Sequence, residues 1–297
     1  MFRIASFSGL AHNEMMLLSS FEVARMKTSV QMGSLFIPMN RCPNNFARFC
    51  RPVLLYNHDA QCDLSLRGSS LLFRHKSRYF VICTSHQFGV GSEARAPKDM
   101  VIAITNENND VIGLTGSEVT HIQIENLAHK NAEDMLLMEY DPVKSGRDLT
   151  PLFFNVDLER IGTLNTVPTE NIDAIFTIGF MSTSTDYDPV FDEDYNQLGT
   201  TIVSRWSKLY LQPTQVGPWL PTLRMGLEVH AYQQEATVKS ADYDPDGLSG
   251  APVGFIYRDK SQQRHFGFAG MITHADKLGR FAIYPTELIN EVMAKHT

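Results

Sequence analysis

Residues 246–252 of the chain read DGLSGAP and lead directly into an apolar run, VGFIY at 253–257. Glycines on both sides of a serine permit a tight turn that exposes the hydroxyl, and such a turn can aim backbone N–H groups at one point. Ser249 is therefore a candidate nucleophile, and the N–H groups of Gly247 and Ser249 are candidate donors for an oxyanion hole. Because ordinary turns use the same small residues, the pattern gains meaning only from partners elsewhere in the chain.

Two upstream segments supply such partners. A hairpin pattern at 68–73 and 79–84 runs directly into His86, and Asp134 stands immediately before the apolar run 135–138, where it could be buried against an imidazole. A histidine, a carboxylate and a serine are the three groups that nucleophilic acyl transfer needs as base, orienting group and nucleophile. The order along the chain is His86, Asp134, Ser249.

These segments resemble the trypsin/chymotrypsin-like serine peptidases, and among them the bacterial Deg-type enzymes more than the digestive ones. The G-D/N-S-G-G-P signature of that family corresponds to GLSGAP at 247–252, its T-A-x-H motif to TSH at 84–86, and its D-I-A/M-L-L motif to DMLL at 134–137. Residues 267–273 (GFAGMIT) and 279–285 (GRFAIYP) are similar to the strands that line the substrate, and a closing helix follows them.

The resemblance implies an all-β, chymotrypsin-like fold of two antiparallel six-stranded β-barrels with the active site between them. His86 and Asp134 would come from the first barrel and Ser249 from the second. His86 would be the general base, and Asp134 would fix its tautomer. Thr273 falls where the family has a serine that hydrogen-bonds the aspartate, on the strand along which an extended substrate would pair.

The chain departs from the family pattern near the serine. Leu248 stands where zymogen-activated relatives have an aspartate, so activation by a newly cut N-terminus is not expected, and Ala251 replaces a glycine. Tyr243 lies six residues before the serine, where trypsin-like enzymes carry a pocket aspartate, so a preference for Lys or Arg is not implied. Tyr243, His274 and Ala275 are expected to wall the specificity pocket.

Hydrophobic periodicity predicts four regions. They are an N-terminal extension over 1–50 with an amphipathic helix at 9–27, a first barrel over 51–145, a linker over 146–170, and a second barrel with a C-terminal helix over 171–297. Thr286 is expected to cap that helix, at 286–295. Residues 108–110 predict a hairpin turn. The predicted strands are 62–66, 70–75, 79–84, 100–105, 111–114, 119–125 and 135–140 in the first barrel, and 174–179, 200–211, 225–233, 252–257, 265–273 and 280–284 in the second.

Composition narrows the class of protein. The 297 residues are 43% apolar and carry a net charge of −7 without any basic stripe, which argues for a globular domain and against nucleic acid as a partner. No apolar run approaches the roughly 20 residues of a membrane span, so we expect no membrane association, no signal peptide and a cytoplasmic location. The four cysteines lie within the first 83 residues without a CxxC pair and are expected as free thiols, with a Cys42–Cys50 disulfide as the alternative.

Metal and cofactor sites are not predicted. Residues 242–247 (DYDPDG) imitate the start of an EF-hand loop, but Val253 stands where the bidentate glutamate belongs and Pro245 interrupts the loop. A solvated acidic loop is expected there, and the acidic segment 186–194 is expected as an exposed insertion of the second barrel. No HExxH motif is present.

The sequence therefore predicts a serine endopeptidase that acts on polypeptides, is regulated or narrow in specificity, and has no PDZ-like module after the second barrel. A regulatory protein partner is left open. An α/β-hydrolase is disfavoured because that fold needs the order serine, acid, histidine. A catalytically silent barrel that binds peptides is the alternative from another class.

Overall fold

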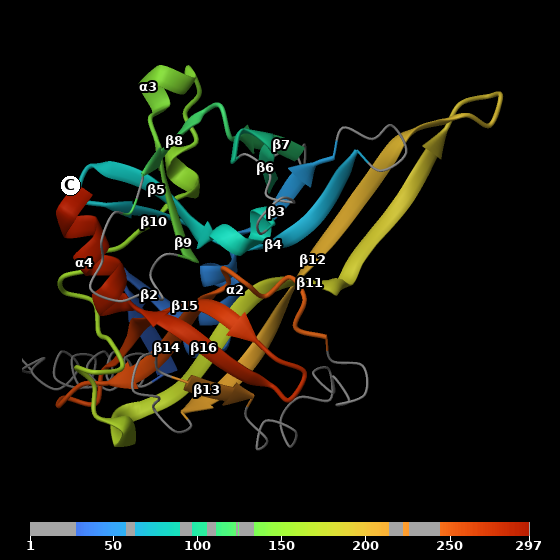
Figure 1. Ribbon diagram of the computed structural model, residues 1–297. Coiled ribbons are helices and arrows are strands. Elements are labelled where there is room, and N and C mark those ends of the chain that lie inside the picture. Colours follow the sequence, from blue (N-terminus) through green and yellow to red (C-terminus); the bar gives the residue numbers. More distant parts are fainter. Residues whose placement is uncertain are drawn as a thin grey trace, which may run out of the picture.

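Two β-sheets make up most of the protein (Figure 1), so the all-β class is confirmed. The computed structural model describes residues 28–57, 63–89, 97–105, 111–122, 124, 134–213, 222–225 and 244–296. The helix expected at 9–27, the turn at 108–110, Tyr243 and most of the strand expected at 225–233 lie outside these residues.

The first sheet has the order β7-β6-β3-β4-β5-β9-β8. Strands β7 and β8 follow each other in the chain with only residues 116–118 between them. Counted as one bent strand, they close a ring of six through the pairs β7–β6 and β8–β9. The strands are β3 (Cys50–Tyr56), β4 (Leu64–His75), β5 (Arg78–Thr84), β6 (Met100–Thr105), β7 (Val111–Thr115), β8 (Val119–Ile122) and β9 (Met135–Tyr140), and β10 (Phe154–Asn155) pairs in parallel with β4.

The second sheet runs β14-β11-β12-β13-β16-β15, and a further pairing of β14 with β15 closes these six strands into an antiparallel ring. The two-barrel prediction is thereby confirmed at the level of fold class. The strands are β11 (Ile172–Phe191), β12 (Gln197–Pro213), β13 (Thr222–Met225), β14 (Pro252–Arg258), β15 (Arg264–Ala275) and β16 (Arg280–Pro285).

A hairpin before the first sheet was not predicted. Strands β1 (Ser29–Met32) and β2 (Leu35–Pro38) pair with each other, and β1 adds in parallel to β15 of the second sheet. The short helices η1 (Met39–Arg41) and α2 (Cys42–Ala47) follow. They place Phe46 in the core between the sheets, where its ring packs edge-on against Phe154 and Phe176. Residues 28–47 thus connect both sheets.

Several predicted strand boundaries need correction. Residues 64–66 of the segment expected at 62–66 and the whole segment expected at 70–75 belong to the single strand β4. Strand β3 was missed although its apolar run 53–55 is buried. The largest difference concerns β11 and β12, because both extend beyond the barrel as a two-stranded ribbon (Figure 1). The acidic segment 186–194 is exposed as expected, but most of it belongs to this regular ribbon.

Helix α4 (Thr286–His296) forms where the sequence predicts a helix, at 286–295. The hydroxyl of Thr286 donates to the carbonyl of Phe268 in β15, so this side chain ties the helix to the sheet. The other short helices in the described parts of the chain are η2 (Ser85–Phe88), η4 (Pro97–Asp99), α3 (Pro142–Ser145), η6 (Thr150–Leu152) and η7 (Thr169–Asn171).

Candidate active site

Asp134, His86 and Ser249 form one hydrogen-bonded chain. Nδ1 of His86 lies 2.7 Å from Oδ2 of Asp134, and Nε2 lies 2.8 Å from Oγ of Ser249. A carboxylate can only accept, so Nδ1 carries the hydrogen and Nε2 is left to accept from the serine hydroxyl. The His86 and Asp134 side chains remain 34% and 22% exposed, so the group is open to solvent and to a ligand.

Strand pairing brings the base and the carboxylate together. Thr84 at the end of β5 pairs with Met135 at the start of β9, so the residues just beyond this pair, His86 in η2 and Asp134, lie side by side. Oδ1 of Asp134 also accepts the backbone N–H of His86 at 2.9 Å. With both carboxylate oxygens bound to His86, the orientation of the imidazole is fixed.

The turn that presents Ser249 depends on its two glycines. Gly247 and Gly250 have φ values of +92° and +80°, in a region that disfavours residues with a side chain. A Cβ on Gly247 would lie 2.2 Å from the Phe180 carbonyl, and one on Gly250 would lie 2.0 Å from the Ser69 carbonyl. Glycine is therefore required at both places by conformation and by space.

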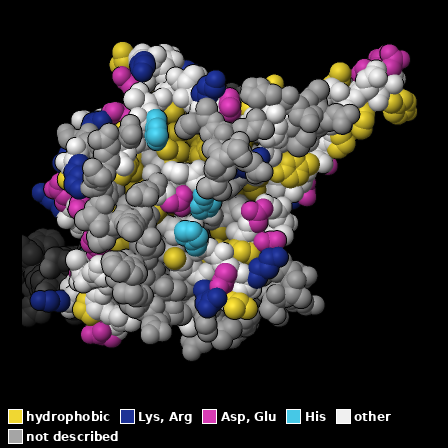
Figure 2. All heavy atoms as spheres, in the orientation of Figure 1, with side chains coloured by type: hydrophobic (Ala, Val, Ile, Leu, Met, Phe, Trp, Pro, Cys, Tyr) yellow, Lys and Arg dark blue, Asp and Glu magenta, His cyan; other side chains and the backbone are white. Residues whose placement is uncertain are grey.

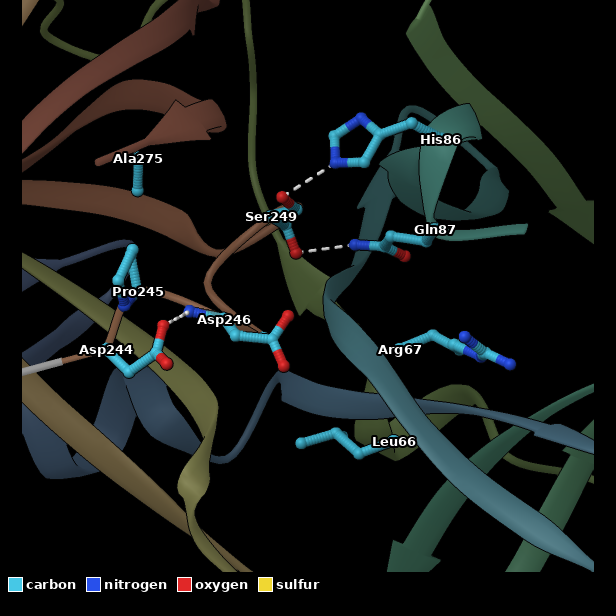
Figure 3. A pocket seen from close by; sticks show the side chains of 10 residues that line it. Leu66, Arg67, His86, Gln87, Asp244, Pro245, Asp246, Ser249 and Ala275 are labelled. Atoms are coloured by element: carbon cyan, nitrogen blue, oxygen red, sulfur yellow. Dashed lines mark hydrogen bonds between the residues drawn. The ribbon is translucent and has the colours of Figure 1, made fainter. Parts of the chain in front are cut away.

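The serine turn docks on the first sheet through Ser69 and Gln87, which the sequence reasoning did not single out. Ser69 donates its backbone N–H to the Ser249 carbonyl at 2.9 Å and its hydroxyl to the Gly247 carbonyl at 2.8 Å. Gln87, directly after His86, donates from Nε2 to the carbonyl of Ser249 (Figure 3) and to that of Ser69. In the sequence, only their position pointed to these two residues: Ser69 lies in the predicted hairpin at 68–73, and Gln87 directly follows His86.

The N–H groups of Gly247 and Ser249 have no acceptor among the described residues, whereas those of Leu248, Gly250 and Ala251 each donate to a carbonyl. The Asp246 carbonyl accepts the N–H of Ser182 at the root of the ribbon. Because carbonyl and N–H point in opposite directions across a trans peptide, this bond turns the Gly247 N–H away from β11. Two donors next to the Ser249 hydroxyl are thus available to an oxygen of a ligand.

Thr273, His274 and Ala275, which are expected to bind substrate, have different surroundings in the structure. Ala275 lines the pocket, and the ring of His274 stacks on His86 at 5.7 Å between centroids. Thr273 is buried, but its hydroxyl contacts His274 Nδ1 and the Ala282 carbonyl, so the expected hydrogen bond to Asp134 is not formed. Figure 2 shows two histidines beside an acidic side chain in the middle of this face.

The pocket at Ser249 has a volume of about 380 Å³. Leu66 and Arg67 of β4 border it on one side, and Asp244 and Asp246 belong to the segment that leads into the serine turn (Figure 3). The Asp246 carboxylate accepts the Ser182 hydroxyl at 2.5 Å. The pocket therefore carries charges of both signs next to the nucleophile.

No known protein family matches the chain by sequence, and no curated protein does so. Among solved structures, the chain is similar to a thermostable serine protease, AL20, from an extremophilic microorganism, with 9% identity and a TM-score of 0.40. The match covers 84% of this chain and 98% of that protein. At this level of similarity, the chemistry of the site has to be argued from the residues themselves.

Within the part of the chain that the structure describes, no helix is long and apolar enough to cross a bilayer. The same residues contain no group of three or more His, Cys, Asp or Glu side chains arranged to hold a metal ion.

Proposed function

We propose that this protein is a serine endopeptidase of the trypsin/chymotrypsin-like type that cleaves polypeptides through an acyl-enzyme. The observation that carries the proposal is the continuous chain from Asp134 through His86 to Ser249, at 2.7 and 2.8 Å. These distances lie within the reach that a base and its nucleophile need. Affiliation with the Deg-type enzymes and narrow or regulated specificity are parts of the proposal that rest on the sequence.

In the acylation step, Oγ of Ser249 attacks the carbonyl carbon of the scissile peptide while Nε2 of His86 takes its proton. The negative charge that develops on the carbonyl oxygen is stabilised by the N–H groups of Gly247 and Ser249. Asp134 accepts from Nδ1–H and stabilises the imidazolium. His86 then returns the proton to the leaving amine, and the C–N bond breaks.

In the deacylation step, His86 removes a proton from water, which attacks the ester carbon. The same two N–H groups hold the oxyanion, and Ser249 leaves with the proton from His86. The proposed mechanism uses side chains and water and no cofactor. The acyl part of the substrate would extend along β15 at Thr273–Ala275, with His274, Ala275 and Tyr243 near the side chain before the scissile bond.

The first test is labelling with a fluorophosphonate probe, followed by intact mass measurement and peptide mapping. We expect one adduct at Ser249 that is lost in Ser249→Ala and falls at least 100-fold in rate in His86→Ala, because the serine then lacks its base. Circular dichroism should show that both variants remain folded.

Absence of an adduct on the folded wild-type protein would contradict the proposal. It would favour the alternative of a catalytically silent barrel that binds peptides. An adduct that forms equally well in His86→Ala would show that the imidazole does not act as the base.

A further inference from the structure

The ribbon formed by the outer parts of β11 and β12 has two chemically different faces. Thr185 through Val190 pair residue by residue with Ser204 down to Gly199, and side chains of directly paired residues share a face. One face carries Tyr187 paired with Ile202, followed by Pro189 and Phe191. We define these four residues as the apolar ribbon face.

The opposite face is mostly polar. It carries Asp186, whose carboxylate is paired with Arg205 at 2.6 Å, and Asp188. Val203, opposite Asp186, and Val190, opposite Gly199, also lie on this face with the pair Asp188 and Thr201 between them. The side chains of Val190 and Val203 are 44% and 39% exposed. Apolar side chains on a sheet normally alternate toward a core, yet Tyr187 and Phe191 are 41% and 52% exposed. The apolar ribbon face is therefore available to a ligand.

The apolar ribbon face is continuous with the candidate active site. The hydroxyl of Tyr187 accepts the backbone N–H of Leu66 at 3.0 Å, and Leu66 with its neighbour Arg67 borders the pocket at Ser249. Because Tyr187 belongs to the apolar face, that face is turned toward β4 and the pocket. In Figure 3, Leu66 and Arg67 lie at the end of the pocket away from Ala275.

The charged side chains of the ribbon indicate what kind of ligand the apolar ribbon face would bind. Residues 181–206 contain five carboxylates and one arginine. Three of the carboxylates, Asp192, Glu193 and Asp194, lie at the tip, where Figure 2 shows acidic side chains next to apolar ones. An anionic surface would be repelled by this tip, whereas a chain with basic groups would be attracted.

We propose that the apolar ribbon face docks an unfolded segment of the polypeptide substrate that is apolar and flanked by lysine or arginine. The segment would lie on the leaving-group side of the scissile bond, since the acyl side is proposed along β15. That part of the inference rests on the proposed function. Docking itself requires only that the ribbon bind such a chain.

The test measures binding in the Ser249→Ala background, so that no cleavage occurs. The probe is fluorescein-labelled lysozyme that has been reduced and carboxamidomethylated, an unfolded polypeptide with excess positive charge. We expect Phe191→Ser/Ile202→Ser to weaken binding at least five-fold in fluorescence anisotropy. The matched control Val190→Ser/Val203→Ser removes apolar area from the other face of the same ribbon and should change the Kd less than two-fold.

Two comparisons complete the test. Native folded lysozyme and carboxamidomethylated α-lactalbumin, which is unfolded but acidic, should both bind at least five-fold more weakly than the unfolded basic probe. Equal effects of the two double variants, or equal binding of either comparison protein, would overturn the proposal. A change of oligomeric mass in sedimentation equilibrium with Phe191→Ser/Ile202→Ser would instead assign the face to a second copy of the chain.

Fluorophosphonate labelling of the wild-type protein separates this proposal from the proposed function. If the ribbon binds the unfolded basic probe as expected but the wild-type protein is not labelled at Ser249, the proposed peptidase activity is refuted and the docking surface stands. If Ser249 is labelled but the two double variants bind the unfolded basic probe with the same Kd, the docking surface is refuted and the proposed peptidase activity stands.

Discussion

Gln87 shows how a single side chain can hold two parts of a site together. It stands next to His86, is 4% exposed, and donates to the carbonyls of Ser249 and Ser69. The base and the nucleophile come from different sheets, so bonds of this kind determine how closely they approach. A hydrogen bond to a buried carbonyl contributes more than one to an exposed carbonyl, because water cannot take the place of a lost donor at a buried site.

We therefore predict that Gln87→Leu lowers the free energy of unfolding by about 2 kcal/mol, from two lost hydrogen bonds at roughly 1 kcal/mol each. Urea unfolding measures the loss. The matched control is Gln31→Leu, because Gln31 also bonds a backbone carbonyl, that of Gly33, but in an exposed place. We expect less than about 0.5 kcal/mol there, and equal losses in the two variants would contradict a special role for Gln87.

Gly250 gives a second prediction at this scale. The φ of Gly250 is +80°, and a Cβ at this position would lie 2.0 Å from the Ser69 carbonyl oxygen. Gly250→Ala therefore introduces both backbone strain and a steric clash. We expect a loss of about 2 to 4 kcal/mol in unfolding free energy. Gly33→Ala is the control, because Gly33 has φ +60° with nothing within 4 Å, so it should cost only about 1 kcal/mol. A smaller effect at position 250 than at position 33 would show that the serine turn has room to move.

At the scale of elements, the β4–β5 hairpin is part of the first sheet and also positions residues of the candidate active site. It supplies Ser69, leads through β5 into His86, and ends in a turn where His75 pairs with Arg78. His75 is 1% exposed, and its Nδ1 has no hydrogen-bond partner among the described residues. Burial, reinforced by the charge of Lys76, lowers the pKa of His75.

The lowered pKa makes the stability of the fold depend on pH. In the unfolded chain His75 takes up a proton near pH 6.5, whereas in the folded protein it does so only at lower pH. The unfolded state therefore binds more protons just below pH 6.5, and stability falls as the pH drops from about 7 toward 5, by at most about 1.4 kcal/mol per pH unit. Urea midpoints against pH should show this slope, and His75→Leu should flatten it. An unchanged slope in the variant would refute the assignment to His75.

At the scale of the whole molecule, the core protects the thiols. Cys42, Cys50 and Cys83 are free and buried, so within the described residues the expectation of free thiols is confirmed, and Cys62 lies outside them. Burial raises the pKa of Cys42 to about 12 and raises those of Cys50 and Cys83 further. Thiolates are the reactive form, so these three thiols should be inert in the folded state.

Iodoacetamide provides the measurement. In native buffer we expect at most one adduct by intact mass, at Cys62, while in guanidinium chloride all four cysteines of the sequence should react. Native modification of Cys50 or Cys83 at a rate near that in denaturant would show that the core opens readily.

Local patterns in the sequence were sufficient for the all-β class, for most strands and for the order His86, Asp134, Ser249. The alternation of apolar side chains and the conformational preference of glycine for turns depend only on residues that are close in sequence, so both can be recognised without a structure. The strands β6 and β9 were predicted with their observed bounds, 100–105 and 135–140, because each is a short run rich in apolar residues between polar segments of the sequence.

Only the tertiary structure decided what joins across the chain. The addition of β1 to β15 and the docking of Ser249 on Ser69 and Gln87 depend on pairings between distant segments. The bond of Thr273 to His274 in place of Asp134, and the apolar ribbon face beside β4, depend on how the two sheets are placed against each other. Backbone N–H and carbonyl groups are the same in every residue, so the sequence does not specify which of them will meet. The partners are selected by the packing of the two sheets, and that selection places the nucleophile against its base.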